Sequence, residues 1–108
     1  MRKNIVAGNW KMNTDLADTQ ELIGGLKKIA KTSDAEVIIA PPFTNLYTAF
    51  ETLKDSDIEV AAQNMHQSSS GAFTGEISAS MLKGVGIKTV ILGHSERRAY
   101  FGEKEDLL

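Results

Sequence analysis

The sequence predicts an α/β fold in which a parallel β-sheet alternates with helices. Short runs of apolar residues begin near positions 5, 37, 58 and 89, and a segment with helical spacing of apolar residues lies between each pair. The runs are continuously apolar, which is typical of strands that are covered on both faces. Strands that alternate with helices are joined by crossover connections, and such connections make the strands parallel.

The composition indicates a small globular protein and excludes several functions. We expect the 108 residues to form a single partial domain, residues 1–108, with a modest core. Lysine and arginine number 12 against 14 acidic residues, the net charge is −2 and aromatic residues make up 6%, so we expect no nucleic acid partner. The chain has no cysteine, which excludes disulfides and thiolate metal sites.

Neither a targeting signal nor a membrane partner is predicted. The apolar run that begins at Ile5 ends at Gly8, which is shorter than the ~7 to 15 residues of a signal-peptide core. No stretch approaches the ~18 apolar residues of a membrane span. His66 and His94 are too few and too isolated to indicate a metal site. We therefore expect a cytoplasmic protein that binds no metal.

The first half of the chain predicts two strand–helix pairs. The run from Ile5 to Gly8 is the first strand, and the helix after it carries apolar residues at Leu16, Leu22, Ile23, Leu26, Ile29 and Ala30. Acidic residues early in that segment and lysines late in it favour the helix through the macrodipole. Residues 37–40 are the second strand, which two prolines then end. Thr44 or Asn45 can cap the second helix.

The second half of the chain is less regular than the first. Its expected segments, in order, are a third strand at 58–62, a long polar loop at 63–75, a short helix at 80–85, a fourth strand at 88–92, a brief helical turn at 99–102 and the opening of a further helix at 103–108. Loops as long as the one at 63–75 are usually functional or disordered.

All segments that carry reactive side chains follow a strand rather than precede one. These segments are 9–13, 41–45, 64–76 and 94–98. Because the carboxyl ends of parallel strands meet at the same edge of a sheet, all four segments fall on one rim. In parallel α/β folds this rim is where ligands bind.

Lys11 and Asn9 are candidate binding residues on the first of these segments. Lys11 follows the first strand and lies beside Trp10, which can hold the alkyl stem of the lysine. Its ammonium group can then pair with a phosphate or a developing oxyanion, and an exposed solubilising lysine is the alternative. The amide of Asn9 can hold Lys11 or a ligand, or it can merely cap the turn.

His94 is the strongest candidate for a catalytic group. It stands between the fourth strand and a helical turn whose free backbone N–H groups carry partial positive charge. That charge and partial burial favour the neutral imidazole. A neutral imidazole can donate a hydrogen bond to a substrate carbonyl and then to the enediolate formed from it. The alternative is a charged cluster in a solvated loop.

The residues that follow His94 are expected to support it. Ser95 and Glu96 can orient the histidine and Lys11, whereas the two arginines after them are expected to make structural ion pairs. Glu96 is the only carboxylate immediately beside the histidine. Neighbours in sequence do not necessarily point together, so we interpret Glu96 as a partner for Lys11 and not as the general base.

Five motifs in order resemble the N-terminal part of the triosephosphate isomerase family, in register over essentially the whole chain. They are Gly8-Asn9-Trp10-Lys11-Met12-Asn13, Ala40-Pro41-Pro42-Phe43, Ala62-Gln63-Asn64, Gly71-Ala72-Phe73-Thr74-Gly75-Glu76 and Gly93-His94-Ser95-Glu96-Arg97-Arg98. The resemblance implies a (β/α)8 barrel enzyme of glycolysis and gluconeogenesis. Such an enzyme interconverts dihydroxyacetone phosphate and glyceraldehyde 3-phosphate through an enediolate, without a cofactor.

The resemblance also implies roles for individual residues. Asn9 and Lys11 resemble the substrate-binding pair of the family, and Lys11 would neutralise phosphate and oxyanion charge. His94 resembles its neutral electrophile, with Ser95 and Glu96 in support.

The long polar loop is similar to the loop that interdigitates between the two subunits of the family's homodimer. Thr74 would reach the active site of the partner subunit. Glu76 would pair with the partner subunit's Arg97.

The length of the chain bears on what it can do alone. A complete barrel takes ~250 residues, so 108 residues supply about four of its eight strands. The resemblance places the glutamate base and the closing lid of the family beyond Leu108, and we therefore expect no appreciable isomerase activity from these residues alone. The alternative function is a standalone α/β module that binds a phosphate-bearing ligand on the same rim.

Overall fold

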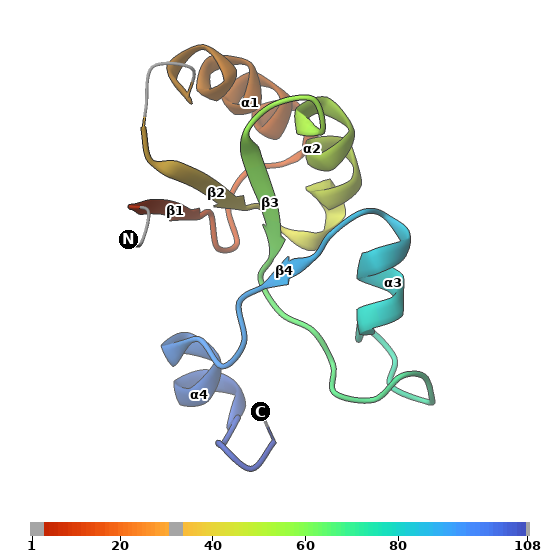
Figure 1. The fold of residues 1–108 in the computed structure, drawn as a ribbon. Helices are drawn as coiled ribbons and strands as arrows, with labels where there is room; N and C mark the ends of the chain where they lie inside the picture. The colour runs from red at the N-terminus through yellow and green to blue at the C-terminus, as the bar shows by residue number, and fades with distance from the viewer. Residues whose placement is uncertain (1–3, 31–33, 108) are drawn as a thin grey trace.

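A computed structural model of the protein describes residues 4–30 and 34–107. Its elements, in chain order, are β1 (Ile5–Asn9), α1 (Leu16–Ala30), β2 (Glu36–Ala40), the 3-10 turn η1 (Phe43–Asn45), α2 (Leu46–Leu53), β3 (Ile58–Ala62), α3 (Ala79–Gly84), β4 (Thr89–Val90) and α4 (Ser95–Phe101) (Figure 1). Strands and helices alternate along the chain, which confirms the α/β class.

The four strands form one parallel sheet in the order β1-β2-β3-β4. The register places Asn9, the last residue of β1, opposite Ala40, the last residue of β2. Ala62, the last residue of β3, lies opposite Val90, the last residue of β4. The strands therefore end at one edge, and the segments that follow them meet there as predicted.

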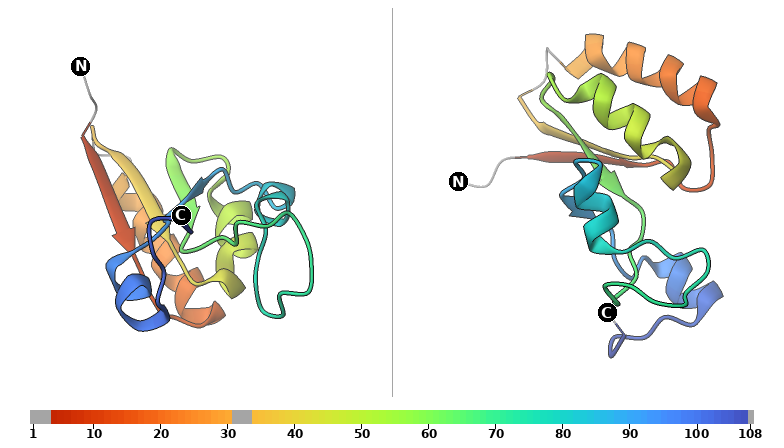
Figure 2. Two further views of the ribbon diagram at one scale, coloured as in Figure 1. Left: turned by 90° about the horizontal axis from the view of Figure 1, so that it is seen from below. Right: turned by 90° about the vertical axis from the view of Figure 1, so that its right-hand side faces the viewer.

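The core lies between the sheet and two helices. Figures 1 and 2 show α1 and α2 side by side on one face of the sheet. Ile23 of α1, Leu53 of α2 and Val60 of β3 are buried in this layer, where apolar area removed from water stabilises the fold. Leu26 packs against the same cluster, whereas Leu16, Leu22 and Ile29 are exposed, and the side chain of Ala30 lies outside the described part of the chain.

The first strand is not covered on both faces, contrary to the prediction. Ile5 and Val6 are each 58% exposed. Within the described residues β1 is an edge strand that pairs with β2 alone. A continuously apolar run shows that a strand is suited to burial, but burial itself depends on a layer that packs against the strand.

The end of the chain also departs from the prediction. β4 spans only Thr89–Val90, although the N–H of Ile91 still donates to the carbonyl of Ala62 at 2.9 Å. Helix α4 begins at Ser95, which is earlier than the expected turn at 99–102, because Glu and Arg are good helix formers and extend the turn toward His94. Gly102 ends α4 in the left-handed conformation (φ 69°) that glycine adopts readily.

Residues 105–107 form a turn and do not open a helix, and Leu108 lies outside the described residues. The longest described helix, α1, has 15 residues. None of the helices in the described ranges combines the length and the apolar character that crossing a bilayer requires.

Candidate active site

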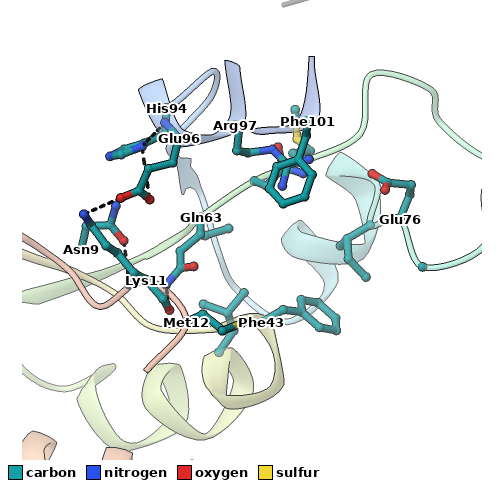
Figure 3. A pocket seen from close by; sticks show the side chains of 16 residues that line it. Asn9, Lys11, Met12, Phe43, Gln63, Glu76, His94, Glu96, Arg97 and Phe101 are labelled. Atoms are coloured by element: carbon teal, nitrogen blue, oxygen red, sulfur yellow. Dashed lines mark hydrogen bonds and ion pairs between the residues drawn. The ribbon is translucent and has the colours of Figure 1, made fainter. Parts of the chain in front are cut away.

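A cavity of about 380 Å³ opens at the carboxyl ends of the strands. Its lining comes from the segments that follow β1, β2, β3 and β4 and includes Asn9, Lys11, Phe43, Gln63, Glu76, His94, Glu96 and Arg97 (Figure 3). Residues that are far apart in sequence, from Asn9 to Phe101, thus line one cavity.

Lys11 is held at both its backbone and its ammonium group. Its backbone N–H donates to Asn9 Oδ1 at 2.9 Å, so the Asn9 side chain caps the turn after β1. Its Nζ donates to Glu96 Oε1 at 2.6 Å, across the cavity edge from α4. This pair joins the segments that follow the two outer strands of the sheet, and it is the Lys11–Glu96 contact that the sequence predicts.

The hydrogen bond from Lys11 is the main reason why the pKa of Glu96 lies below its ordinary value. The positive charge of Lys11 adds to this effect, whereas the partial burial of Glu96 opposes it. The side chains of Lys11 and Glu96 are 51% and 42% exposed, so solvent screens their attraction. Glu96 is therefore ionised at neutral pH and cannot serve as a proton donor there.

His94 is the N-cap residue of α4. Its Nδ1 accepts a hydrogen bond from the backbone N–H of Glu96 at 3.1 Å. An Nδ1 atom that accepts an N–H does so through its lone pair, and this arrangement corresponds to the tautomer with the proton on Nε2. The cap thus leaves Nε2–H as a hydrogen-bond donor on a residue that lines the cavity.

Glu96 Oε2 lies 3.6 Å from the same Nδ1 atom, which suggests a second arrangement. An ion pair between them would require a proton on Nδ1. The backbone N–H of Glu96 faces that nitrogen at the shorter distance of 3.1 Å and occupies its lone pair. His94 still contributes, after Lys11, to the lowered pKa of Glu96.

The two arginines of α4 support the local fold, as the sequence predicts. Arg97 Nε donates to Glu103 Oε2 at 2.7 Å, and its guanidinium group lies 5.0 Å from the centre of the Phe101 ring. Arg98 Nε donates to the carbonyl of Gly93 at 2.8 Å, and Arg98 also lies near Glu105, at 3.7 Å.

The other predicted site residues differ in how they relate to the cavity. Glu76 lines its far side (Figure 3), whereas Thr74 lies in the exposed part of the long loop and is not among the lining residues. Ser95 opens α4 and is exposed. Arg97 is paired with Glu103 within the chain, so its pairing with Glu76 between subunits stays a prediction.

Gln63 is a site residue whose individual role the sequence does not predict. Its Nε2 donates to the carbonyl of Lys11 at 2.9 Å and to the carbonyl of Ala40 at 2.8 Å. These bonds tie the loop after β1 to the ends of β2 and β3. Its position could have identified it, because Gln63 directly follows a buried strand, as the other segments with reactive side chains do.

No metal centre is found in the described part of the chain. Nowhere in residues 4–30 and 34–107 do three His, Asp or Glu side chains come together in a way that could hold an ion. The polar side chains that line this cavity carry an ammonium group, a guanidinium group, an imidazole, amides and two carboxylates.

The Lys11–Glu96 pair is expected to depend on pH. Because the pKa of Glu96 is lowered in the folded protein, the pair adds stability above the unfolded pKa and loses it as the pH falls through the folded value. A carboxyl ¹³C NMR titration should place the midpoint of Glu96 below the ordinary value of a glutamate. Lys11→Met should move the midpoint upward, and an unchanged midpoint in that variant would contradict the account of the pair.

Comparison with known proteins identifies the relatives of the chain. The family model described as triosephosphate isomerase matches residues 4–108. The triosephosphate isomerase of Flavobacterium johnsoniae is 57% identical over 109 residues, covering 100% of this chain and 44% of the relative. That of Flavobacterium psychrophilum is 55% identical with the same coverage, and that of Alkaliphilus metalliredigens is 51% identical over 98% of this chain and 43% of the relative. The chain thus spans less than half the length of these relatives.

Proposed function

Because the chain belongs to the triosephosphate isomerase family, we propose that it forms part of an enzyme that interconverts dihydroxyacetone phosphate and glyceraldehyde 3-phosphate. One observation carries the proposal. Lys11, after β1, and His94, after β4, line the same cavity, and Glu96 links them through its side chain and its backbone N–H.

Lys11 is proposed to bind the substrate and to stabilise charge during the reaction. Triose phosphates carry a negative phosphate group, and removal of a proton beside the carbonyl adds negative charge to the enediolate. The ammonium group of Lys11 supplies a compact positive charge that can pair with the phosphate and with the enediolate. Asn9 supports binding, because it lines the cavity and fixes the turn that carries Lys11.

His94 is proposed to act as the neutral electrophile. Its Nε2–H would donate to the substrate carbonyl oxygen, and this hydrogen bond would strengthen as negative charge develops on that oxygen. A protonated imidazole is not needed for this role. The cap on Nδ1 keeps the donor on the side of the ring that is free for a ligand.

We assign the general base to no residue of this chain. Glu96 is bound to Lys11 and has a lowered pKa, which makes it a weak base. We propose that the base is the family glutamate, which lies outside the segment matched here. Ser95 and Glu96 then act as support for the two groups that touch the substrate.

Assembly and cellular setting are proposed from the family. We propose a homodimer in which Thr74, Glu76 and Arg97 lie at the interface, since the long loop that carries Thr74 and Glu76 is exposed. We also propose a cytoplasmic enzyme of glycolysis and gluconeogenesis that needs no cofactor.

A chimaera tests the proposed function. In it the present 108 residues replace the corresponding N-terminal segment of the Flavobacterium johnsoniae isomerase, and the purified protein is assayed in both directions. We expect kcat within about tenfold of that of the parent enzyme. A difference of that size corresponds to a change of only ~1.4 kcal/mol in activation free energy.

The parent enzyme and a preparation from cells without the chimaera gene are the controls. A chimaera that folds and dimerises like its parent but shows no isomerase turnover would refute the proposed function. A chimaera that binds inorganic phosphate without turnover would favour the standalone binding module.

A further inference from the structure

Two residues in the loop between β1 and α1 have a backbone conformation that side chains disfavour. Lys11 has φ 56° and Thr14 has φ 73°, and neither is glycine. A positive φ is uncommon for any residue with a Cβ, and for a β-branched residue such as threonine it is an outlier. Such strain persists only where the surrounding structure holds it in place.

Each strained residue has its carbonyl oxygen held by a side-chain amide. Gln63 Nε2 donates to the carbonyl of Lys11 at 2.9 Å, and Asn45 Nδ2 donates to the carbonyl of Thr14 at 3.1 Å. The two amides come from different parts of the chain, the end of η1 and the residue after β3. The loop is thus fixed at both strained positions from outside.

Both amides are anchored themselves. Gln63 Nε2 also donates to the carbonyl of Ala40 at 2.8 Å, so its two N–H groups bridge the loop and the end of β2. Asn45 is 2% exposed and also donates to Thr19 Oγ1 at 3.0 Å. Although Asn45 stands at the N-cap of α2, its side chain makes no cap bond. Its side-chain amide instead donates to the loop and to helix α1.

We propose that Gln63 is a positioning residue that sets the place of the Lys11 ammonium group, with Asn45 as the second anchor of the same loop. The inference rests on the proposed function. Gln63 acts on the carbonyl of the very residue whose side chain is proposed to bind phosphate. Without that bond, the strained backbone at Lys11 relaxes and its Nζ moves away from the cavity.

Substitution of Gln63 in the chimaera tests the inference. Gln63→Met keeps the length of the side chain and removes both N–H donors. We expect kcat/KM to fall by about 10- to 100-fold, with KM for the triose phosphate raised, because displacement of a binding group by about 1 Å has effects of this size. Gln20→Met, on the exposed surface of α1, is the matched control and should leave both constants unchanged.

The same substitution in a Lys11→Met background separates positioning from general stability. If Gln63 acts through Lys11, Gln63→Met should cause no further loss of kcat/KM once the ammonium group is gone. An equal fold loss in both backgrounds would overturn the inference, as would a folded Gln63→Met chimaera with normal constants. If Gln63→Met does not fold, Gln63→Asn takes its place, because it keeps the amide and shortens the side chain. We then expect a smaller loss of kcat/KM that is again absent in the Lys11→Met background.

A titration distinguishes failure of this inference from failure of the proposed function. If the unsubstituted chimaera has no turnover, the proposed function has failed, and Lys11 can still be followed through its partner Glu96. Gln63→Met should then raise the pKa of Glu96 toward the value in the Lys11→Met variant. A Glu96 midpoint that Gln63→Met does not move would overturn the positioning role.

Discussion

Replacement of His94 by asparagine is expected to lower kcat of the chimaera by about 10²- to 10³-fold, the usual cost of losing one preorganised donor to a developing oxyanion. The substitution removes Nε2–H, which we propose as the hydrogen-bond donor to the substrate oxygen. KM should change little, because the bond strengthens mainly as the enediolate forms.

Asparagine is chosen because His94 also caps α4. The imidazole accepts the backbone N–H of Glu96, and an asparagine side chain is among the best acceptors at an N-cap. The variant should therefore keep the helix start and unfold thermally close to the parent chimaera. Loss of kcat without loss of thermal stability supports the catalytic role. Full kcat in a stable His94→Asn variant would exclude His94 as the electrophile.

Replacement of Lys11 by methionine is expected to lower kcat/KM by about 10³-fold, given that each hydrogen bond to a charged group contributes ~1.5–3 kcal/mol. Methionine keeps the unbranched apolar stem and removes the charge. Because the ammonium group is proposed to meet both the bound phosphate and the enediolate, KM should rise and kcat should fall together. This pattern differs from that of His94→Asn.

Lys83→Met is the matched control for Lys11→Met. Lys83 lies exposed on α3 and has the same side chain, so its replacement removes an equal charge from the protein as a whole. Steady-state kinetics of both variants, with thermal unfolding as a check on folding, give the comparison. Equal losses in the two variants would mean that net charge, and not the position of Lys11, controls the activity.

Much of the architecture follows from local patterns in the sequence. Four apolar runs with helical segments between them are enough to predict the parallel sheet. All segments with reactive side chains follow strands, so the sequence also predicts that they meet at one rim of the sheet. The pairing of Lys11 with Glu96 could be expected on chemical grounds, since the two residues carry opposite charge on that rim.

The remaining features depend on contacts that leave no local pattern. The exposure of Ile5 and Val6 reflects which faces of the sheet other elements cover. Gln63 reaches a carbonyl 52 positions earlier in the chain, and no periodicity predicts such a bond. The left-handed backbone at Lys11 and Thr14 cannot be predicted from the sequence either, because lysine and threonine do not favour this conformation.

The most direct test of the account compares two chimaeras that differ only in this chain's two proposed active-site groups. One carries the native residues, and the other carries Lys11→Met and His94→Asn together. The account predicts isomerase turnover by the first and a kcat/KM at least about 10³-fold lower for the second, since the second lacks both the cation and the oxyanion donor. Equal turnover by the two folded proteins would contradict it.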